Sequence, residues 1–506
     1  MRQARVKPKL PLKRAIPSGL LAGAIITLSL IPTRGVAFSL LGPYADWMDI
    51  QKGYGQRGDI GGPMNIGEGY RWNIPVITYG FTRPFLDYFG SNGVAAAESA
   101  LGVINQLPPA STVDPYGYTN NVSQYNSIAG SLLLLDVKSQ VLNTLLEEMG
   151  LADPVRWDFC IRDFLPAGTN YSFYVIPRNF HPLTALSSPY VNDTLFTYRI
   201  YQNGVAPSPS QVFCDAYEFL VDPLQPFYSA AAAQSPPVYG RFLTGLSRDD
   251  VGGLRYLLSG SQIRFESLLP DVHLAPTSSG PLVRMAYRPG IEKITFIRHP
   301  AGTLTGQFLP FTNRWTDVYY APDYPAYQDV ERVTSQPDIL FGAQDLGVEV
   351  GWTRTGTTNW ANNAALNGNP GGAGPGVIQP PIVITLNTVG PFYINYPNFL
   401  DEPGAVLVAG WGSFYTTTNT PFIYPDIGIT FQPTEVQFHL TVAGLTHDFS
   451  WTLPGPAYGR FLFQTATNLA DWTTLTTITN SGAQFDYQFS ALANEPSRFF
   501  RTVPVR

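Results

Sequence analysis

The chain of 506 residues is poor in charged side chains, histidine and cysteine. Charged residues make up 13% of the sequence, about half the share of an average soluble protein. Lys and Arg total 31 against 37 Asp and Glu, and an acidic surface disfavours contact with nucleic-acid phosphates. The five histidines are scattered and form no HExxH or HxH pair, so the usual signature of a zinc peptidase is missing.

Other motifs that carry chemistry are also missing. The sequence has no GxSxG nucleophile elbow, no GxxxxGK[ST] phosphate loop and no GxGxxG loop after a predicted strand. These absences disfavour a serine hydrolase and a nucleotide-dependent enzyme, and no cofactor or metal is expected. A glycosidase stays open, because two carboxylates at the right separation leave no sequence signature.

The N-terminus carries the signs of export. The first 34 residues hold seven of the 31 basic residues and no acidic one. An apolar run from Ala15 to Ile31 is followed by the small-x-small tripeptide Gly35-Val36-Ala37, which predicts a signal peptide over residues 1–37 with cleavage near Ala37. An uncleaved signal anchor is the alternative. No other stretch is long enough for a membrane span, so we expect a secreted or cell-surface mature chain.

The sequence contains only two cysteines, Cys160 and Cys214. After export they would meet an oxidising compartment, and the sequence therefore predicts a disulfide between them.

The longest segment with a clear helical period is Leu132–Pro154. Its apolar residues recur every three or four positions, and Gly150 followed by Pro154 predicts the end of the helix. The same reasoning predicts an earlier helix from Asn92 to Leu107, after a strand at Arg71–Phe81. A third helix is predicted within Leu246–Leu258, where Ser247 and Asp250 have the spacing of a capping box.

This order of strand, long helix and glycine-terminated helix resembles the matrixin-like metzincins. The sequence LSRDDVGGLRYLL at Leu246–Leu258 is also similar to the helix that closes their catalytic domain. The resemblance implies an α+β zincin-like domain over residues 38–260.

When the glycine of the metzincin zinc motif is aligned with Gly150, four residues of this chain fall at the family's active-site positions. Asn143, Thr144, Glu147 and Asp153 fall where the family has its first histidine, catalytic glutamate, second histidine and third ligand. Asn143 is a poor zinc ligand and Thr144 cannot act as a general base, so the resemblance predicts a pseudo-active site without zinc or peptidase activity. A weak calcium site and a plain solvated helix face are the alternatives.

The remainder of the chain is rich in predicted strands separated by Pro, Gly and Asn loops. We expect a β-rich domain over residues 261–430 and a small β-sandwich over 431–506. The segment FLFQTATNLADWTTLTTITNSG in the last module resembles C-terminal modules of large secreted proteins from Verrucomicrobia and related bacteria.

A long loop between Trp352 and Pro381 contains a candidate ligand-binding group. Trp360 lies beside Asn359, Asn362 and Asn363, and stacking plus amide hydrogen bonds would suit a sugar. An irregular turn cluster packed on the β domain is the alternative.

These observations favour a secreted or cell-surface non-catalytic protein with a binding or architectural role. Its expected partner is an unknown extracellular ligand, a glycan or a cell-surface protein, and not a nucleic acid. The alternative is a secreted hydrolase, either a divergent metallopeptidase or a carboxylate-based glycosidase.

Overall fold

The computed structural model describes a large part of the chain after the expected signal peptide. All of its described residues belong to the compact unit Gly35–Arg506. They are residues 35–54, 60–167, 170–203, 212–233, 238–302, 306–322, 324–344, 348–349, 352–353, 356–361, 375–388, 392–393, 406–407, 410–424, 434–442, 445–453, 460–468, 471–479, 485–490 and 498–504.

Strands dominate the fold and form many small sheets. The described residues contain four α-helices, α1 (Arg83–Asn105), α2 (Ser127–Ser131), α3 (Val137–Glu148) and α4 (Arg248–Leu258). The prediction of an α+β zincin-like domain over residues 38–260 is therefore wrong. Its strands pair mostly in short hairpins and small sheets, and strand β4 (Val76–Phe81) pairs with strands that lie after residue 260.

The central sheet has the order β18-β4-β21-β26-β24. Its first four strands are parallel, and the fifth is antiparallel to β26. The inner strands β4, β21 and β26 are rich in apolar residues, as expected for parallel strands covered on both faces, and Ile77, Phe341 and Ile384 are fully buried. Besides β4, the strands are β18 (Thr295–Arg298), β21 (Ile339–Gln344), β26 (Gln379–Asn387) and β24 (Gly356–Ala361).

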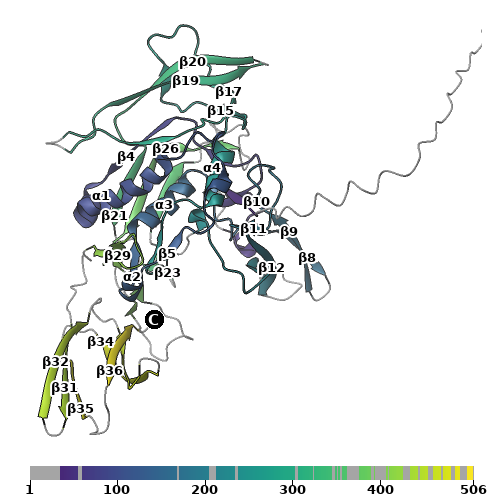
Figure 1. The fold of residues 1–506 in the computed structure, drawn as a ribbon. Helices are drawn as coiled ribbons and strands as arrows, with labels where there is room; N and C mark the ends of the chain where they lie inside the picture. The colour runs from purple at the N-terminus through teal and green to yellow at the C-terminus, as the bar shows by residue number, and fades with distance from the viewer. Residues whose placement is uncertain are drawn as a thin grey trace, which may run out of the picture. The chain divides into compact units, whose positions relative to one another are not determined.

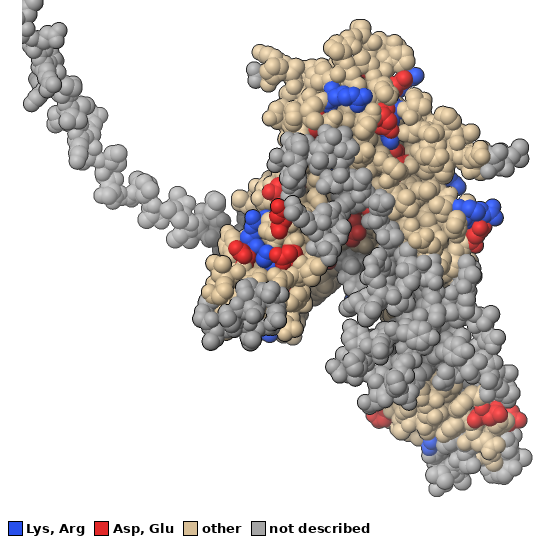
Figure 2. All heavy atoms as spheres, turned by 180° about the vertical axis from the view of Figure 1, so that it is seen from behind, with Lys and Arg blue, Asp and Glu red and all other residues tan. Residues whose placement is uncertain are grey.

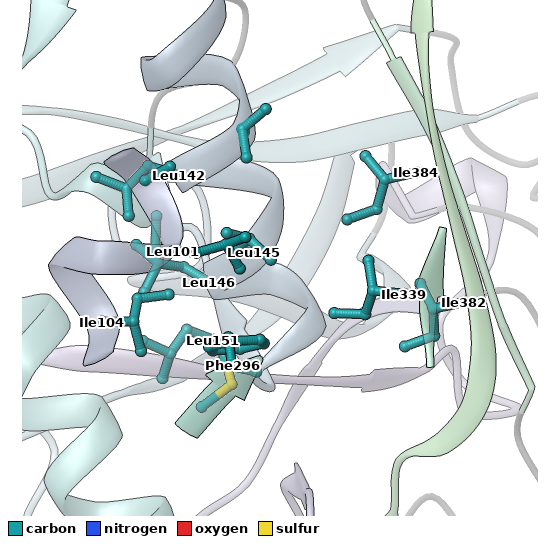
Figure 3. Close-up of a cluster of buried hydrophobic side chains, with 14 of the residues drawn as sticks. Leu101, Ile104, Leu142, Leu145, Leu146, Leu151, Phe296, Ile339, Ile382 and Ile384 are labelled. Atoms are coloured by element: carbon teal, nitrogen blue, oxygen red, sulfur yellow. The ribbon is translucent and has the colours of Figure 1, made fainter. Parts of the chain in front are cut away.

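Helices α1 and α3 pack against each other, and α1 covers the central sheet (Figure 1). Leu101 and Ile104 of α1 lie against Leu145 and Leu146 of α3, with Phe296 of β18 close by (Figure 3). Helix α1 begins earlier than predicted, after the N-cap Thr82, and bends at Gly90, whose φ is 58°. No helix in the described part is long and apolar enough to cross a lipid bilayer.

The predicted helix at Leu132–Pro154 is shorter in the structure. Residues Leu134–Asp136 form strand β6, and Asp136 is the N-cap of α3, accepting a hydrogen bond from the Ser139 backbone N–H at 2.9 Å. Gly150 follows the helix with a φ of 97°, as the predicted glycine stop requires. The capping box of Ser247 and Asp250 at the start of α4 is confirmed.

A second sheet of five antiparallel strands has the order β15-β17-β19-β20-β16. Its long hairpin is labelled β19–β20 in Figure 1. The strands are β15 (Arg264–Ser267), β17 (Met285–Arg288), β19 (Phe311–Ala321), β20 (Tyr324–Thr334) and β16 (Val272–Leu274).

Two hairpins pack on each other through a small core of their own. They are β8–β9 (Phe159–Ala167 and Asn170–Pro177) and β12–β13 (Thr194–Asn203 and Phe213–Leu220). Cys214 belongs to this core together with Ile161, whereas Cys160 belongs to the main core.

The predicted disulfide is wrong, because both cysteines are free and buried in the structure. Neighbouring residues of a strand point to opposite faces, so Cys160 points away from the side of β8 on which Ile161 meets Cys214.

Near the C-terminus, six strands form two three-stranded sheets. Strands β31, β32 and β35 make one sheet, and β33, β34 and β36 make the other. A ring contact of 5.0 Å between Phe463 and Tyr487 joins the two sheets. Their bounds are Thr434–Val442, Leu445–Leu453, Phe485–Ser490, Arg460–Ala466, Thr473–Thr479 and Phe499–Pro504.

Short strands and 3-10 turns complete the described part. A four-stranded sheet contains β1 (Phe38–Pro43), β2 (Ile60–Met64), β7 (Leu151–Ala152) and β10 (Asn179–Phe180). The others are β3 (Tyr70–Arg71), β5 (Ser123–Tyr125), β11 (Tyr190–Val191), β14 (Arg241–Leu243), β22 (Val348–Glu349), β23 (Trp352–Thr353), β25 (Gly376–Val377), β27 (Phe392–Tyr393), β28 (Val406–Leu407), β29 (Gly410–Ser413), β30 (Phe422–Ile423), η1 (Ile50–Lys52), η2 (Pro115–Gly117) and η4 (Ala231–Ala233).

Candidate functional site

The first two predicted pseudo-active-site residues are packed inside the protein. Asn143 is 3% exposed, and its side-chain amide donates a hydrogen bond to the Ala231 carbonyl oxygen at 3.0 Å. Thr144 is also buried, and its hydroxyl accepts a hydrogen bond from Gln140 Nε2 at 3.2 Å. Turn η4 therefore covers the position at which a metzincin-like site needs an open cleft.

The other two predicted residues, Glu147 and Asp153, are brought together and are half-buried. Burial, reinforced by the negative charge of Asp153, raises the pKa of Glu147 to about 7. Burial raises the pKa of Asp153 to about 6, although the backbone N–H groups of Val155 and Arg156 donate hydrogen bonds to its carboxylate.

No group of three or more potential metal ligands occurs in the described part of the chain. The Asp153 carboxylate accepts hydrogen bonds from the turn that follows it, which is a local structural role.

The candidate sugar-binding group around Trp360 falls at the limit of the described ranges. Asn359 and Trp360 lie in strand β24, whose backbone pairs with β26, so this part of the predicted loop is a strand. Asn362 and Asn363 lie outside the described residues.

An apolar pocket lies where α1, α3 and α4 meet, and Ile104, Met149 and Leu254 line part of it. Its cavity volume is about 20 Å³. A single water molecule needs about 10 to 15 Å³ by the same measure, so the pocket is too small for a sugar ring.

A larger feature, which the sequence did not reveal, is the outward face of the sheet β15-β17-β19-β20-β16. Phe265 is 38% exposed, Tyr287 56% and Tyr327 65%. We call this surface the aromatic face and define it by its outward apolar side chains, Phe265, Met285, Tyr287, Val318, Tyr320 and Tyr327.

Strand register places these side chains side by side. Phe265 is paired with Tyr287, and Tyr287 is paired with Tyr320 on the next strand. Val318 is paired with Tyr327 across the long hairpin. The rings of Phe265 and Tyr287 have centroids 5.1 Å apart, so side chains from neighbouring strands form one continuous surface.

The aromatic face continues into a polar strip, made of Arg314, Thr316, Asp329 and Glu331. These residues follow the same face of β19 and β20, where Arg314 is paired with Glu331 and Thr316 with Asp329. Arg314 Nε donates to Glu331 Oε2 at 2.9 Å, and the Thr316 hydroxyl donates to Asp329 Oδ1 at 2.7 Å. His273 of β16 is exposed and is paired with Glu331.

The opposite face of the same sheet is charged and buried. Arg288 Nε and Nη2 donate to the two carboxylate oxygens of Asp317 at 2.9 and 3.0 Å. Glu266 accepts a hydrogen bond from Arg71, and Arg332 from β20 forms an ion pair with Asp338 at 2.6 Å. Because every second residue forms these buried ion pairs and hydrogen bonds, the aromatic residues between them point outward.

Alternation of this kind was visible in the sequence, for example at Met285-Ala286-Tyr287-Arg288. The pattern does not say which set is buried, and hydrophobicity alone would have placed the aromatic set inside. Figure 2 shows that uncharged surface covers much of the described part, with basic and acidic side chains next to each other. No family model, curated protein or solved structure matches this chain, so its function has to be inferred from its own surfaces.

Proposed function

We propose that this chain is an extracellular carbohydrate-binding protein and that the aromatic face is its binding surface. The observation that carries the proposal is a row of exposed Phe and Tyr rings on one sheet face, bordered by the polar strip. Contiguous exposed apolar surface of this kind marks binding sites in soluble proteins.

The chemistry of the face suits a sugar polymer. Aromatic rings pack on the apolar faces of sugar rings, and the Tyr hydroxyls keep a polar end for hydrogen bonds. The carboxylates of Asp329 and Glu331 accept hydrogen bonds from hydroxyl groups, and the Arg314 guanidinium donates them. Stacking surface and polar groups on one face are the two requirements for recognising a polyhydroxylated ring.

The geometry favours an extended, uncharged chain over a small molecule. Strands are about 4.8 Å apart and outward residues of one strand about 7 Å apart, so the aromatic face is longer than one sugar ring. Arg314 is neutralised by Glu331, and the Asp329 carboxylate keeps one negative charge on the strip, which disfavours an acidic polymer. A neutral polysaccharide is therefore the ligand class that we propose, and the predicted signal peptide would deliver the protein to it.

The test is sedimentation of the mature chain with insoluble cellulose, chitin and xylan, and affinity electrophoresis with soluble neutral polysaccharides. The double variant Y287A/Y327A removes two exposed rings and should weaken binding by at least about tenfold, which is 1.4 kcal/mol. Y174A is the matched control, because Tyr174 is 63% exposed but lies in the hairpin β8–β9.

Unchanged thermal unfolding of Y287A/Y327A would show that the loss is one of binding and not of folding. Equal binding by the double variant and the native chain would contradict the proposal. The proposal would also be contradicted if the chain bound none of the polysaccharides and instead bound a protein ligand through Tyr287 and Tyr327.

A further inference from the structure

Two arginines share one tryptophan on a part of the molecule that the proposed function does not use. Trp47 lies in the turn between β1 and η1, and its ring centroid is 4.3 Å from Arg162 Cζ and 5.8 Å from Arg178 Cζ. Arg162 comes from β8, and Arg178 follows β9. All three side chains are half-buried.

Neither arginine has a carboxylate partner among the described residues. This is unusual in a chain with fewer basic than acidic residues, since Arg71, Arg288 and Arg332 each form an ion pair. Arg178 donates only a long hydrogen bond of 3.5 Å to the Pro177 carbonyl oxygen, and its buried Nε has no partner in the described part.

The one carboxylate that acts on the Arg178 pKa does not neutralise the pair. Glu68 acts on Arg178 electrostatically but forms no ion pair with it, and its carboxylate accepts a hydrogen bond from the Asn65 backbone N–H at 2.8 Å. Burial lowers the pKa of Arg178, and the positive charge of Arg162 lowers it further. Two like charges held together cost free energy, and a bound anion would recover it.

The surroundings hold the tryptophan in place. Trp47 meets Tyr54 edge-on at 5.3 Å, and Tyr54 stacks on Trp157 at 5.6 Å. The Tyr54 hydroxyl donates to the Ile161 carbonyl oxygen at 2.9 Å, next to Arg162 in β8. Because each ring is fixed by the next, both guanidinium groups pack against a rigid surface before any ligand arrives.

We infer that Trp47, Arg162 and Arg178 form a binding site for an oxyanion, namely a carboxylate, sulfate or phosphate group. A guanidinium presents a planar fork of donors that matches two oxygens of such a group, and its position over an aromatic ring orients that fork. Partial burial weakens screening by water and salt, which strengthens the attraction. This inference does not depend on the proposed function.

The experiment is isothermal titration of the mature chain at low ionic strength with sodium sulfate, phosphate and acetate. A uronic-acid oligosaccharide and a sulfated oligosaccharide then distinguish a carboxylate-bearing from a sulfate-bearing ligand. We expect millimolar or tighter binding of at least one probe, and at least a tenfold loss in R162Q/R178Q. R83Q is the matched control, because Arg83 is exposed and pairs with Asp87 on the surface of α1.

Two further variants keep the test decisive. R162Q changes one half-buried side chain and serves if the double variant does not fold, while R162K/R178K keeps the charge and removes the planar forks, so it should also bind more weakly. Failure of every probe to bind, or equal binding by R162Q/R178Q and the native chain, would overturn the inference. Retention of neutral polysaccharide by R162Q/R178Q separates this site from the aromatic face.

Discussion

Arg71 Nε donates a hydrogen bond to Glu266 Oε1 at 2.7 Å, and the two side chains are only 1% and 2% exposed. Arg71 belongs to β3, and Glu266 belongs to the sheet that carries the aromatic face. The remaining Arg71 donors reach the backbone carbonyl oxygens of Leu257, Gln262 and Arg288. One buried guanidinium thus joins this sheet to the end of α4 and to the main core.

Breaking this ion pair should destabilise the protein strongly. E266Q leaves the Arg71 charge buried without its counter-charge, so we expect urea denaturation to give a free energy of unfolding lower by about 3 to 5 kcal/mol. E331Q is the control, because it breaks the exposed pair with Arg314 and should cost less than about 1 kcal/mol. Equal effects of the two variants would contradict the structural role of Arg71.

Asp158 should make stability depend on pH. Its side chain is fully buried, neither carboxylate oxygen has a hydrogen-bond partner in the described part, and burial raises its pKa to about 8. The pKa in the folded state is higher than in the unfolded state, so its stabilising effect is complete below about pH 4 and is lost as the pH rises toward 8.

D158N stays neutral and should therefore remove this pH dependence. Between pH 4 and pH 8 we expect the native chain to lose on the order of 5 kcal/mol relative to D158N, measured by urea denaturation at each pH. D163N is the control, since Asp163 is exposed and lies in β8, which begins directly after Asp158. Parallel pH profiles for the native chain and D158N would argue against a buried, unpartnered carboxyl at this position.

The two cysteines should be reduced in the native protein. Unfolding without a reductant should expose two thiols per chain to a colorimetric thiol reagent. In the folded state the reaction should be slow, because burial raises the pKa of Cys160 to about 12 and that of Cys214 to about 11. A count of zero thiols after unfolding would restore the disulfide that the sequence suggested.

Gly150 should tolerate no side chain. Its φ is +97°, and an added Cβ would lie 2.1 Å from the Tyr70 carbonyl oxygen. G150A should therefore lower the free energy of unfolding by at least about 2 kcal/mol. G102A is the matched control, because Gly102 lies inside α1 with open space around it, and alanine there should stabilise the protein by about 0.5 to 1 kcal/mol. A neutral G150A would show that Tyr70 and the loop can move apart.

Local signals in the sequence determined several elements of this protein. Ser247 and Asp250 predict the start of α4 because both partners of a capping box lie within one helical turn. Gly150 predicts the end of α3 because a left-handed residue is needed there. Such interactions span three or four residues, so neighbouring residues alone specify them.

Tertiary pairing decided where α3 begins. Leu134 continues the apolar spacing of the helix, yet Leu134–Asp136 form a strand because Leu134 and Leu135 pair with Gly410 and Trp411. A partner almost 280 positions away leaves no mark on the local pattern. The same holds for the cysteines. The presence of only two, Cys160 and Cys214, suggested a disulfide, but Cys214 packs on the side of β8 opposite to the Cys160 side chain, so both thiols are free.

The candidate site also depended on distant residues. Sequence periodicity could show that Tyr287 alternates with Ala286 and Arg288. It could not show whether the charged or the aromatic side chains are buried, because that depends on the residues that pack against them. Asp317 compensates the Arg288 charge, and Arg71 does the same for Glu266, so the charged set is inside and the aromatic set faces outward. Alternation along a strand specifies two faces. Which face is buried and which faces the solvent is decided by the distant side chains that pack against the strand in the folded chain.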